Sequence, residues 1–381
     1  MKHEQRQWKA PTGWTPRAAH QTNAQLVLVF GSRGCLSQPA ILRQLRADYP
    51  AAILFGCTTA GEIAGDEVID DSVVATAVHF EKTALDAACV RIADYSSSAA
   101  AGEALARKLE QQGLSHVLVL SDGLQVNGSD LVRGLTAALP SPVTISGGLS
   151  GDSSRFEQTL VVFGDPRQQA DAAQSGWIAA VGFRGESLRT ACGSLGGWDP
   201  FGPERRITRS DGNVLYELDG QSALGLYKRY LGEHAADLPS SGLLFPLAIR
   251  AEGDDAVLVR TILAVSDADE SVTFAGDVPQ GQYARLMKAN FDRLVDGATG
   301  AAQAALSGLA NPDLAVLISC VGRKLVLKQR VEDEIEGVRD VLGPRSCLTG
   351  FYSYGEISPF VTGTRCELHN QTMTITTFSE V

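Results

Sequence analysis

Leu26-Val27-Leu28-Val29-Phe30 opens the stretch of sequence that decides the fold, and Gly61-Glu62-Ile63 closes it. Between them lie an amphipathic segment from about Ser37 to Asp48 and a second apolar run at 53–59. Two apolar runs of strand length that flank a segment with helical periodicity are typical of a β-α-β unit. This unit ends in a loop that contains a glycine followed directly by an acidic residue, here called a Gly-acid loop.

The unit recurs at a constant offset of 90 residues, from 26–63 to 116–153. At this offset the strand residues, the helix residues, a proline and the final Gly-acid pair coincide without a gap. A match in one register across strand, helix and loop indicates an internal duplication. A second Gly-Glu-Ile, Gly355-Glu356-Ile357, lies 294 residues after the first. We predict that the loops at Gly61 and Gly151 occupy equivalent positions.

Length and composition predict a two-domain organisation. A chain of 381 residues is longer than one hydrophobic core usually covers. Residues 1–25 are polar and are expected to form an N-terminal arm. The composition shifts to Gly, Pro and Arg between Gly193 and Gly212, which we interpret as the boundary between a domain at 26–200 and one at 213–381. Strands alternate with helices in both, so the predicted class is α/β, with repeated β-α-β units ending in Gly-acid loops and mixed sheets.

Apolar stripes predict two helices in the second half. Met287, Phe291 and Leu294 follow helical spacing, which predicts a helix over about 282–297. A second stripe between Leu327 and Leu342 predicts another helix, whose acidic side faces solvent.

The overall composition excludes several classes of protein. Hydrophobic residues make up 44% of the chain and charged residues 20%, as in soluble globular proteins. The net charge of -11 and the lack of a basic stripe argue against nucleic acid or an anionic membrane as partner. No signal peptide and no apolar run of about 20 residues is visible, so membrane insertion is not expected. Seven scattered cysteines suggest reduced thiols in the cytoplasm.

The C-terminal sequence resembles a known family. Gly350-Phe351-Tyr352-Ser353-Tyr354-Gly355-Glu356-Ile357, followed by His369-Asn370-Gln371-Thr372-Met373-Thr374, is similar to the signature of FIST proteins. These are bacterial sensory proteins with paired FIST N and FIST C domains, here expected at 26–200 and 213–381. The supporting strings are Tyr216-Glu217-Leu218-Asp219-Gly220, Phe245-Pro246-Leu247, Ser319-Cys320-Val321-Gly322-Arg323 and Gly147-Gly148-Leu149-Ser150-Gly151-Asp152.

The resemblance implies a cytosolic ligand-binding protein in signal transduction. One subset of the family senses nitric oxide through haem and controls a histidine kinase or a cyclic-di-GMP enzyme, and a haem b sensor of this kind is our first expectation. A sensor of amino acids or other small molecules without haem is the alternative. No transmitter, receiver or cyclase segment occurs in the 381 residues, so we expect a stand-alone sensor that acts on a separate partner in trans.

Two groups of loop residues are candidate ligand contacts. Gly147, Gly148 and Gly151 would let backbone N–H groups approach an anion, although a tight turn alone would also require glycine. Asp152 and Glu356 hold equivalent places in their units, as Glu62 does in the first. A carboxylate that only braces the loop is the alternative for all three acids.

Aromatic residues and a histidine complete the predicted site. Phe351, Tyr352 and Tyr354 combine apolar area with hydroxyl groups, which suits a pocket, although core packing is equally open. His369, next to Asn370, is the candidate axial ligand of haem, with a structural hydrogen bond as the alternative. Cys366 and His369 lack a matching second pair, so no structural metal site is expected.

Enzyme motifs are absent from the sequence. It contains no P-loop, no Gly-x-Ser-x-Gly elbow and no His-Glu-x-x-His. Cys57 and Cys320 lie at or near strand ends but have no evident base. The chain is therefore expected not to be an enzyme, and a hydrolase with a scattered active site stays open as a third class.

Overall fold

Three β-α-β units form the framework of the protein. The computed structural model describes residues 1–381 except 22, 168–169, 254–256, 307–308 and 310. In each unit the two strands pair in parallel, so the β-α-β repeat and the α/β class predicted from the sequence are confirmed. The units are β3 (Leu26–Gly31), α2 (Pro39–Asp48) and β4 (Ile53–Thr58); β9 (Leu114–Ser121), α4 (Gly128–Ala138) and β10 (Thr144–Leu149); and β23 (Leu314–Cys320), α8 (Val331–Leu342) and β24 (Cys347–Ser353).

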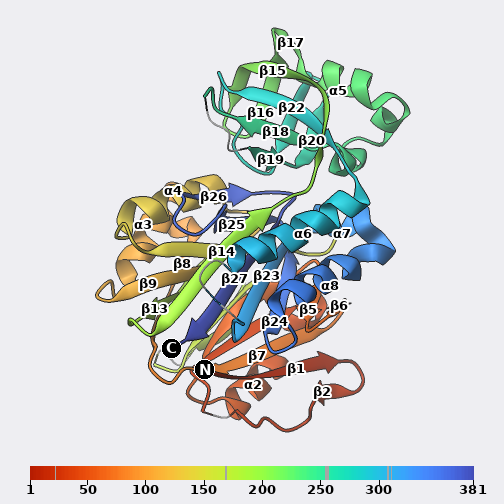
Figure 1. Ribbon diagram of the computed structural model, residues 1–381. Coiled ribbons are helices and arrows are strands. Elements are labelled where there is room, and N and C mark those ends of the chain that lie inside the picture. Colours follow the sequence, from red (N-terminus) through yellow and green to blue (C-terminus); the bar gives the residue numbers. More distant parts are fainter. Residues whose placement is uncertain (22, 168–169, 254–256, 307–308, 310) are drawn as a thin grey trace.

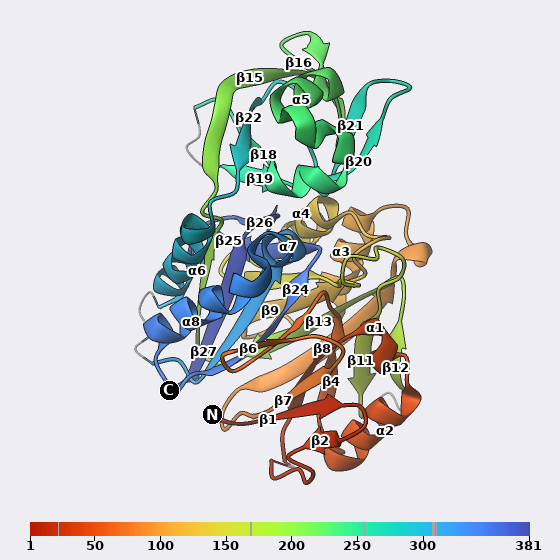
Figure 2. The same cartoon turned by 90° about the vertical axis from the view of Figure 1, so that its right-hand side faces the viewer.

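Each unit belongs to its own sheet, and the three sheets make up the body of the molecule (Figures 1 and 2). The first sheet has the order β12-β11-β4-β3-β7-β1-β2, the second β26-β25-β10-β9-β13-β8, and the third β14-β27-β23-β24-β5-β6. The further strands are β1 (Lys2–Lys9), β2 (Gly13–Thr15), β5 (Glu62–Ala64), β6 (Glu67–Ile69), β7 (Val73–His79), β8 (Ala84–Arg91), β11 (Val161–Asp165), β12 (Ala170–Gln174), β13 (Trp177–Arg184), β14 (Leu188–Leu195), β25 (Gly355–Pro359), β26 (Cys366–His369) and β27 (Met373–Glu380).

A common apolar core joins the three sheets. Phe30 and Phe55 of the first sheet, Phe183 of the second, and Phe351 and Phe378 of the third belong to one buried cluster. Helices pack on the outer faces of the sheets, where α2 has its own cluster with the first sheet. The remaining helices are α1 (Arg33–Leu36), α3 (Ser98–Lys108), α5 (Ala223–Leu231), α6 (Phe291–Ala305) and α7 (Val321–Leu327), with 3₁₀ turns at Ile92–Asp94, Gly232–Asp237, Ser240–Leu244 and Lys328–Arg330.

Residues 199–288 form a smaller unit, here called the β-lobe, which lies above the body in Figure 1. Its eight-stranded sheet has the order β19-β18-β22-β15-β16-β21-β20, with β17 paired to β16, and α5 packs into its core. The strands are β15 (Asp199–Asp211), β16 (Val214–Leu218), β17 (Gln221–Ser222), β18 (Leu247–Arg250), β19 (Leu258–Arg260), β20 (Ile262–Ser266), β21 (Ser271–Phe274) and β22 (Tyr283–Lys288).

Strands from both halves of the chain pair in the same sheets. The predicted division into 26–200 and 213–381 did not include this exchange of strands. β5 pairs with β24, and β25 pairs with β10, so each half supplies strands to a sheet of the other. The Gly-, Pro- and Arg-rich segment from 193 to 212, interpreted as the domain boundary, holds the end of β14 and the whole of β15.

The N-terminal segment differs from the polar arm expected for residues 1–25. β1 runs antiparallel to β7 over seven residue pairs. Because most side chains of β1 are polar, the hydropathy pattern did not indicate a strand here. Arg6, for example, is fully buried, and its guanidinium binds Asp48, the Pro16 carbonyl and the Arg17 carbonyl.

The helix predicted over 282–297 is wrong in its first half. Residues 283–288 form β22, and the helix α6 begins only at Phe291, where the Asn290 side chain accepts a hydrogen bond from the Arg293 N–H. Met287 lies in the strand, and its apolar spacing to Phe291 is therefore accidental. The second predicted helix is α8 from Val331 to Leu342, and only Leu327 of its stripe belongs to the preceding α7, because Lys328 adopts a φ of 53° between the two helices. None of the helices among the described residues is long and apolar enough to cross a membrane.

Candidate functional site

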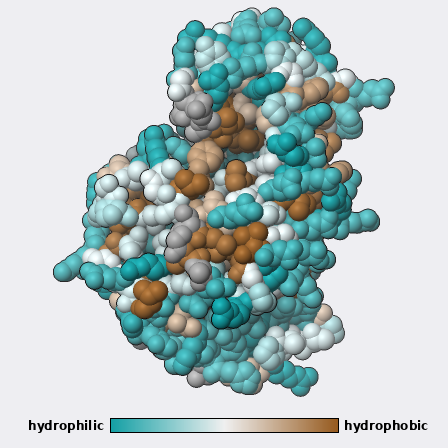
Figure 3. All heavy atoms as spheres, in the orientation of Figure 1, coloured by the Kyte–Doolittle hydropathy of each residue, from teal (hydrophilic) through white to brown (hydrophobic). Residues whose placement is uncertain are grey.

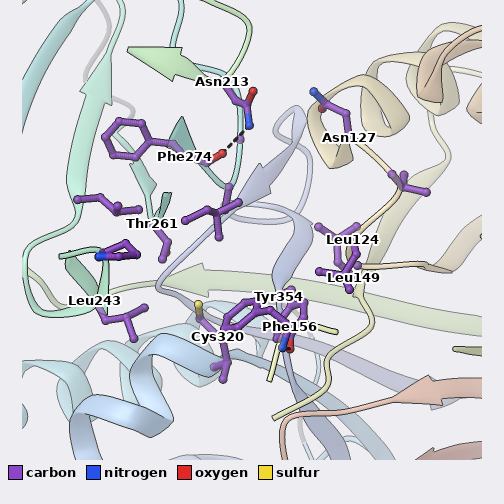
Figure 4. A pocket seen from close by; sticks show the side chains of 18 of the residues that line it. Leu124, Asn127, Leu149, Phe156, Asn213, Leu243, Thr261, Phe274, Cys320 and Tyr354 are labelled. Carbon is purple, nitrogen blue, oxygen red and sulfur yellow. Dashed lines mark hydrogen bonds between the residues drawn. The ribbon is translucent and has the colours of Figure 1, made fainter. Parts of the chain in front are cut away.

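A cavity of about 860 Å³ lies between the body and the β-lobe. The carboxyl ends of the parallel strands in the second and third units open into it, which is where ligands usually bind in α/β folds. Figure 4 shows residues of the second unit on one side, the third unit below and the β-lobe opposite. The lining consists of Gly123, Leu124, Gln125, Val126, Asn127, Leu149, Ser154, Phe156, Asn213, Pro239, Leu243, Thr261, Ile262, Leu263, Phe274, Ala275, Gly276, Cys320, Val321, Leu325 and Tyr354.

The second unit supplies a wall through the loop after β9. Asp122 shapes this loop, because its Oδ1 accepts the N–H groups of Leu124 at 2.8 Å and Gln125 at 2.9 Å. Asn127 caps α4 by accepting from the Asp130 N–H at 3.0 Å, and its Nδ2 donates to Asp277 of the β-lobe at 3.2 Å. This wall is therefore fixed by hydrogen bonds and is tied to the opposite side of the cavity.

The third unit supplies Tyr354, which joins two loops at the floor. Its hydroxyl donates to the Ser153 carbonyl at 3.1 Å and accepts from the Phe156 N–H at 3.2 Å. The Tyr354 and Phe156 rings stack with centroids 4.3 Å apart and an angle of 15°. Phe156 is 39% exposed and has a φ of 54°, which is unusual for a bulky residue.

The β-lobe supplies the opposite wall. Asn213 donates from Nδ2 to the Phe274 carbonyl at 2.7 Å, as the dashed line in Figure 4 marks. Thr261 is only 5% exposed, and its hydroxyl has no hydrogen-bond partner among the described residues. An unpaired buried hydroxyl is costly unless a ligand or water satisfies it.

The cavity lining carries no formal charge. None of its residues is Asp, Glu, Lys, Arg or His, and most of its surface is apolar. On the face of the molecule drawn in Figure 3, apolar side chains also gather where the β-lobe meets the body. Such a cavity holds apolar groups well and gives no counter-charge to an ionised ligand.

The predicted glycine cradle lies inside the sheets. A Cβ at Gly147 would clash with the Val119 carbonyl, and one at Gly148 would come within 2.9 Å of Ile318 Cγ2. The Gly151 N–H donates to the Thr58 carbonyl at 2.8 Å. These glycines permit close strand packing, and none of them lines the cavity.

Two of the three equivalent acids sit in cages of hydroxyl groups. Thr59 and Ser72 donate to Glu62 at 2.5 and 2.6 Å, and burial raises the pKa of this carboxyl from 4.5 to about 7. Ser353 and Thr372 donate to Glu356 at 2.7 and 3.0 Å. Burial raises the pKa of Glu356 from 4.5 to about 8.

The third acid, Asp152, is held by arginines. Its Oδ1 lies 2.6 Å from Arg155 Nη2 and 3.3 Å from Arg33 Nε. Glu62, Glu356 and Asp152 are all buried and fully engaged with neighbours, which is the loop-bracing arrangement described as the alternative to ligand binding.

Only one residue of the predicted aromatic group lines the cavity. Phe351 lies in the core, where its ring centroid is 4.8 Å from that of Phe30. The Tyr352 hydroxyl donates to Glu334 at 2.7 Å and is fully buried. Tyr354 alone of the three faces the cavity.

His369 lies outside the cavity lining. Its Nε2 is 2.8 Å from the Ser358 carbonyl, its ring meets Phe360 edge-on, and burial lowers its pKa to about 4. Asn370 and Gln371 beside it are fully buried, and no described residue pairs with their side-chain amides. Gln371 packs against Gly322 of α7, where a Cβ would clash with its amide.

The position of His369 does not fit an axial ligand of haem. His369 is only 1% exposed and lies outside the cavity, and the cavity lining offers no histidine for iron and no cation for the propionates. No group of three or more His, Cys, Asp or Glu side chains that could hold a metal ion occurs among the described residues.

Cys320, a candidate nucleophile named from the sequence, lines the cavity. Burial raises the pKa of the Cys320 thiol well above its usual value, so the reactive thiolate is disfavoured. The same holds for Cys57, which does not line the cavity. No basic side chain accompanies Cys320 in the lining.

Sequence reasoning missed most of the cavity. The β-lobe residues and the loop at 123–127 belong to no repeated motif, and their positions depend on how separate units pack. One usable signal was the apolar run at 116–120, because the loop that follows such a strand lies at its carboxyl end.

Comparison with protein families gives two matches that together span most of the chain. The model of the FIST N domain matches residues 25–221, and that of the FIST C domain matches residues 223–359. No curated protein matches the sequence.

Proposed function

The chain belongs to the FIST family, and on that premise we propose that it is a cytosolic sensory protein whose small-molecule ligand binds between the β-lobe and the body. FIST domains are associated with sensory signal transduction, in which they bind small ligands. The seven free cysteines support a reducing compartment.

The observation that carries this proposal is the shared lining of the cavity. Loops of the second and third units meet β-lobe residues there, so one ligand touches both parts. The β-lobe joins the body at two chain crossings, before Asp199 and after Lys288. A ligand that contacts both walls stabilises one arrangement of the lobe relative to the body, which converts binding into a change of surface.

The signal would pass to a separate protein that recognises this surface. By family resemblance the partner is a histidine kinase or a cyclic-di-GMP enzyme. Coupling of about 1–3 kcal/mol, roughly a 5- to 150-fold change in partner affinity, is the usual scale, and the partner must change ligand affinity by the same factor.

A haem-based nitric oxide sensor is the narrower form that the resemblance implies. It is tested by the visible spectrum of the protein after incubation with haem b. A Soret band that His369→Ala removes or shifts, with an unchanged circular dichroism spectrum, supports this form. An unchanged Soret band in His369→Ala argues against His369 as the iron ligand.

The general proposal is tested with a matched pair of variants. Leu263 and Leu195 are both 44% exposed, but only Leu263 lines the cavity. Compounds that raise the melting temperature of the protein should lose affinity in Leu263→Trp and keep it in Leu195→Trp. Partner affinity is then compared with and without the compound. Equal partner affinity in both states, or equal ligand affinity in both variants, contradicts the proposal.

A further inference from the structure

We infer that the molecule recognised in the cavity is uncharged and mainly apolar, with an aromatic ring at the Tyr354–Phe156 pair and a polar group at the Thr261 hydroxyl. This inference rests on the proposed function and specifies the ligand class. It departs from both ligands that the sequence suggested, because amino acids and haem carry ionised groups.

The absence of charge from the lining is the first argument. A buried ion is strongly destabilised unless a counter-ion or several hydrogen bonds meet it. Two arginines next to lining residues in the sequence, Arg260 and Arg155, are already engaged. Arg260 donates to the Asp277 and Leu368 carbonyls, at 3.0 and 2.9 Å, and Arg155 is paired with Asp152. An ammonium, carboxylate or phosphate would therefore lose its hydration without a partner.

The size and walls of the cavity fit an apolar molecule. The volume of about 860 Å³ is within the usual range for sites that hold small organic ligands. Both sides contribute apolar groups. They are Leu124, Val126, Leu149, Val321 and Leu325 from the body and Leu243, Ile262, Leu263 and Phe274 from the β-lobe.

The backbone at Phe156 is the second argument. Ser153 and Phe156 have φ values of 53° and 54°, a region that disfavours side chains with a Cβ. The Tyr354 hydroxyl holds this loop by accepting from one residue and donating to the other. The strained loop places a partly exposed aromatic ring at the cavity, and strain of this kind is typical of functional sites. Stacking on the aromatic pair selects a planar ring in the ligand.

The Thr261 hydroxyl gives the third argument. It is the buried side-chain atom of the lining that has no partner among the described residues. A hydroxyl both donates and accepts, so it can meet an amide, an amine N–H or another hydroxyl of a neutral ligand. Because the Thr261 hydroxyl oxygen exposes almost no surface, its side chain must turn towards the cavity to meet such a group, and the hydrogen bond then fixes the orientation of an otherwise apolar molecule.

Two fluorescent probes that differ by one charged group test the inference. N-phenyl-1-naphthylamine is neutral, and 1-anilinonaphthalene-8-sulfonate is the same molecule with a sulfonate. The full chain should bind the neutral probe at least about tenfold more tightly. Phe156→Ala should weaken the neutral probe by roughly tenfold, and Thr261→Val by roughly threefold, the effect of one hydrogen bond.

A charge placed in the wall gives the control. Leu263→Arg should weaken the neutral probe and strengthen the sulfonate, whereas Leu195→Arg, with the same exposure outside the cavity, should change neither. Melting temperatures and circular dichroism confirm that each variant is folded. L-phenylalanine and haem b serve as competitors, and neither should displace the neutral probe.

Three outcomes separate the inference from the proposed function. Tighter binding of the sulfonate than of the neutral probe, or displacement by L-phenylalanine or haem b, overturns the inference and leaves a sensor with a charged ligand. Equal binding of the neutral probe to wild type and Leu263→Arg also overturns it, because the probe then lies elsewhere. A cavity ligand without effect on partner binding contradicts the proposed function alone.

Discussion

The first and third β-α-β units end in nearly the same acid cage but in different surroundings. Glu62 and Glu356 each accept from a hydroxyl three residues earlier and from a second hydroxyl of a later segment. The first loop is closed, because Lys324 binds the Ala60 carbonyl and Asp70 above it. The third loop leads through Tyr354 into the cavity. The repeated residues therefore brace the fold, and the residues that differ between the units build the site.

The largest predicted effect contrasts the helices of the two units. In the third unit Glu334 of α8 and Arg323 form a fully buried ion pair at 2.7 Å, whereas Asp48 of α2 is partly exposed in its pair with Arg6. Removing one partner of a buried pair strands the other charge and costs about 3–5 kcal/mol. We expect Glu334→Ala to lower the free energy of unfolding by this amount.

Asp48→Ala is the matched variant. It should cost less, although Arg6 is buried, because Asp48 is 19% exposed and water that replaces its carboxylate can hydrate the Arg6 guanidinium. Urea unfolding followed by circular dichroism measures both. Equal losses for the two variants would show that the helices of the first and third units are braced alike.

A smaller predicted effect concerns the pH dependence of stability, which should differ between Glu62 and Glu356. Both carboxyls have a raised pKa in the folded protein, about 7 for Glu62 and about 8 for Glu356. The folded state then holds protons that the unfolded state has released above pH 4.5. Stability is therefore fully present below pH 4.5 and falls as pH rises towards 7 or 8, by at most about 1.4 kcal/mol per pH unit and group.

Glutamine variants identify the pH range over which each carboxyl affects stability. Glu62→Gln should remove the loss of stability that ends near pH 7, and Glu356→Gln the loss that continues to about pH 8. Unfolding free energies at intervals from pH 5 to pH 8 provide the measurement. A Glu356→Gln protein with the same slope as wild type between pH 7 and 8 would mean that this carboxyl is already ionised there.

The smallest effect concerns two neighbouring tyrosines of the third unit. Tyr354→Phe removes the hydroxyl that holds Ser153 and Phe156, and we expect a loss of about 1 kcal/mol in stability together with weaker binding of N-phenyl-1-naphthylamine. Tyr352→Phe removes a hydroxyl that binds Glu334 outside the cavity. It should change stability without changing probe affinity.

Fluorescence titration and urea unfolding of the two tyrosine variants distinguish these results. Weaker probe binding by Tyr352→Phe as well would show that the cavity depends on the whole third unit. The distinction between residues that brace the fold and residues that build the site would then be wrong.

The sequence was sufficient for the parts of the fold that local pattern determines. Period-two and helical spacing, with one register across the repeat, predicted the β-α-β units. The strand β1 was missed because its polar residues are satisfied by distant partners, as Arg6 is by Asp48. The helix over 282–297 failed because Met287 and Phe291 belong to different elements that happen to keep helical spacing.

The site was less predictable for a related reason. Selecting residues by repetition, such as Asp152 and Glu356, found those that brace the Gly-acid loops. Thr261 and Phe156 line the cavity because the β-lobe and the body meet there. No spacing of residues within the sequence indicates this contact between separate units. Tyr354 was found because aromatic residues in a loop are a signal of their own.

The exchange of strands between the two halves has a consequence for synthesis of the chain. β5, made early, has its partner β24 only after residues 347–353 have left the ribosome, and one edge of β10 stays unpaired until β25 at 355–359 is made. Until then these edges are open to pairing with other chains. Such distant pairings also slow folding, because the entropy of closing a long loop is lost before the stabilising strand contacts form. The last strands added therefore complete two sheets begun by the first half of the chain.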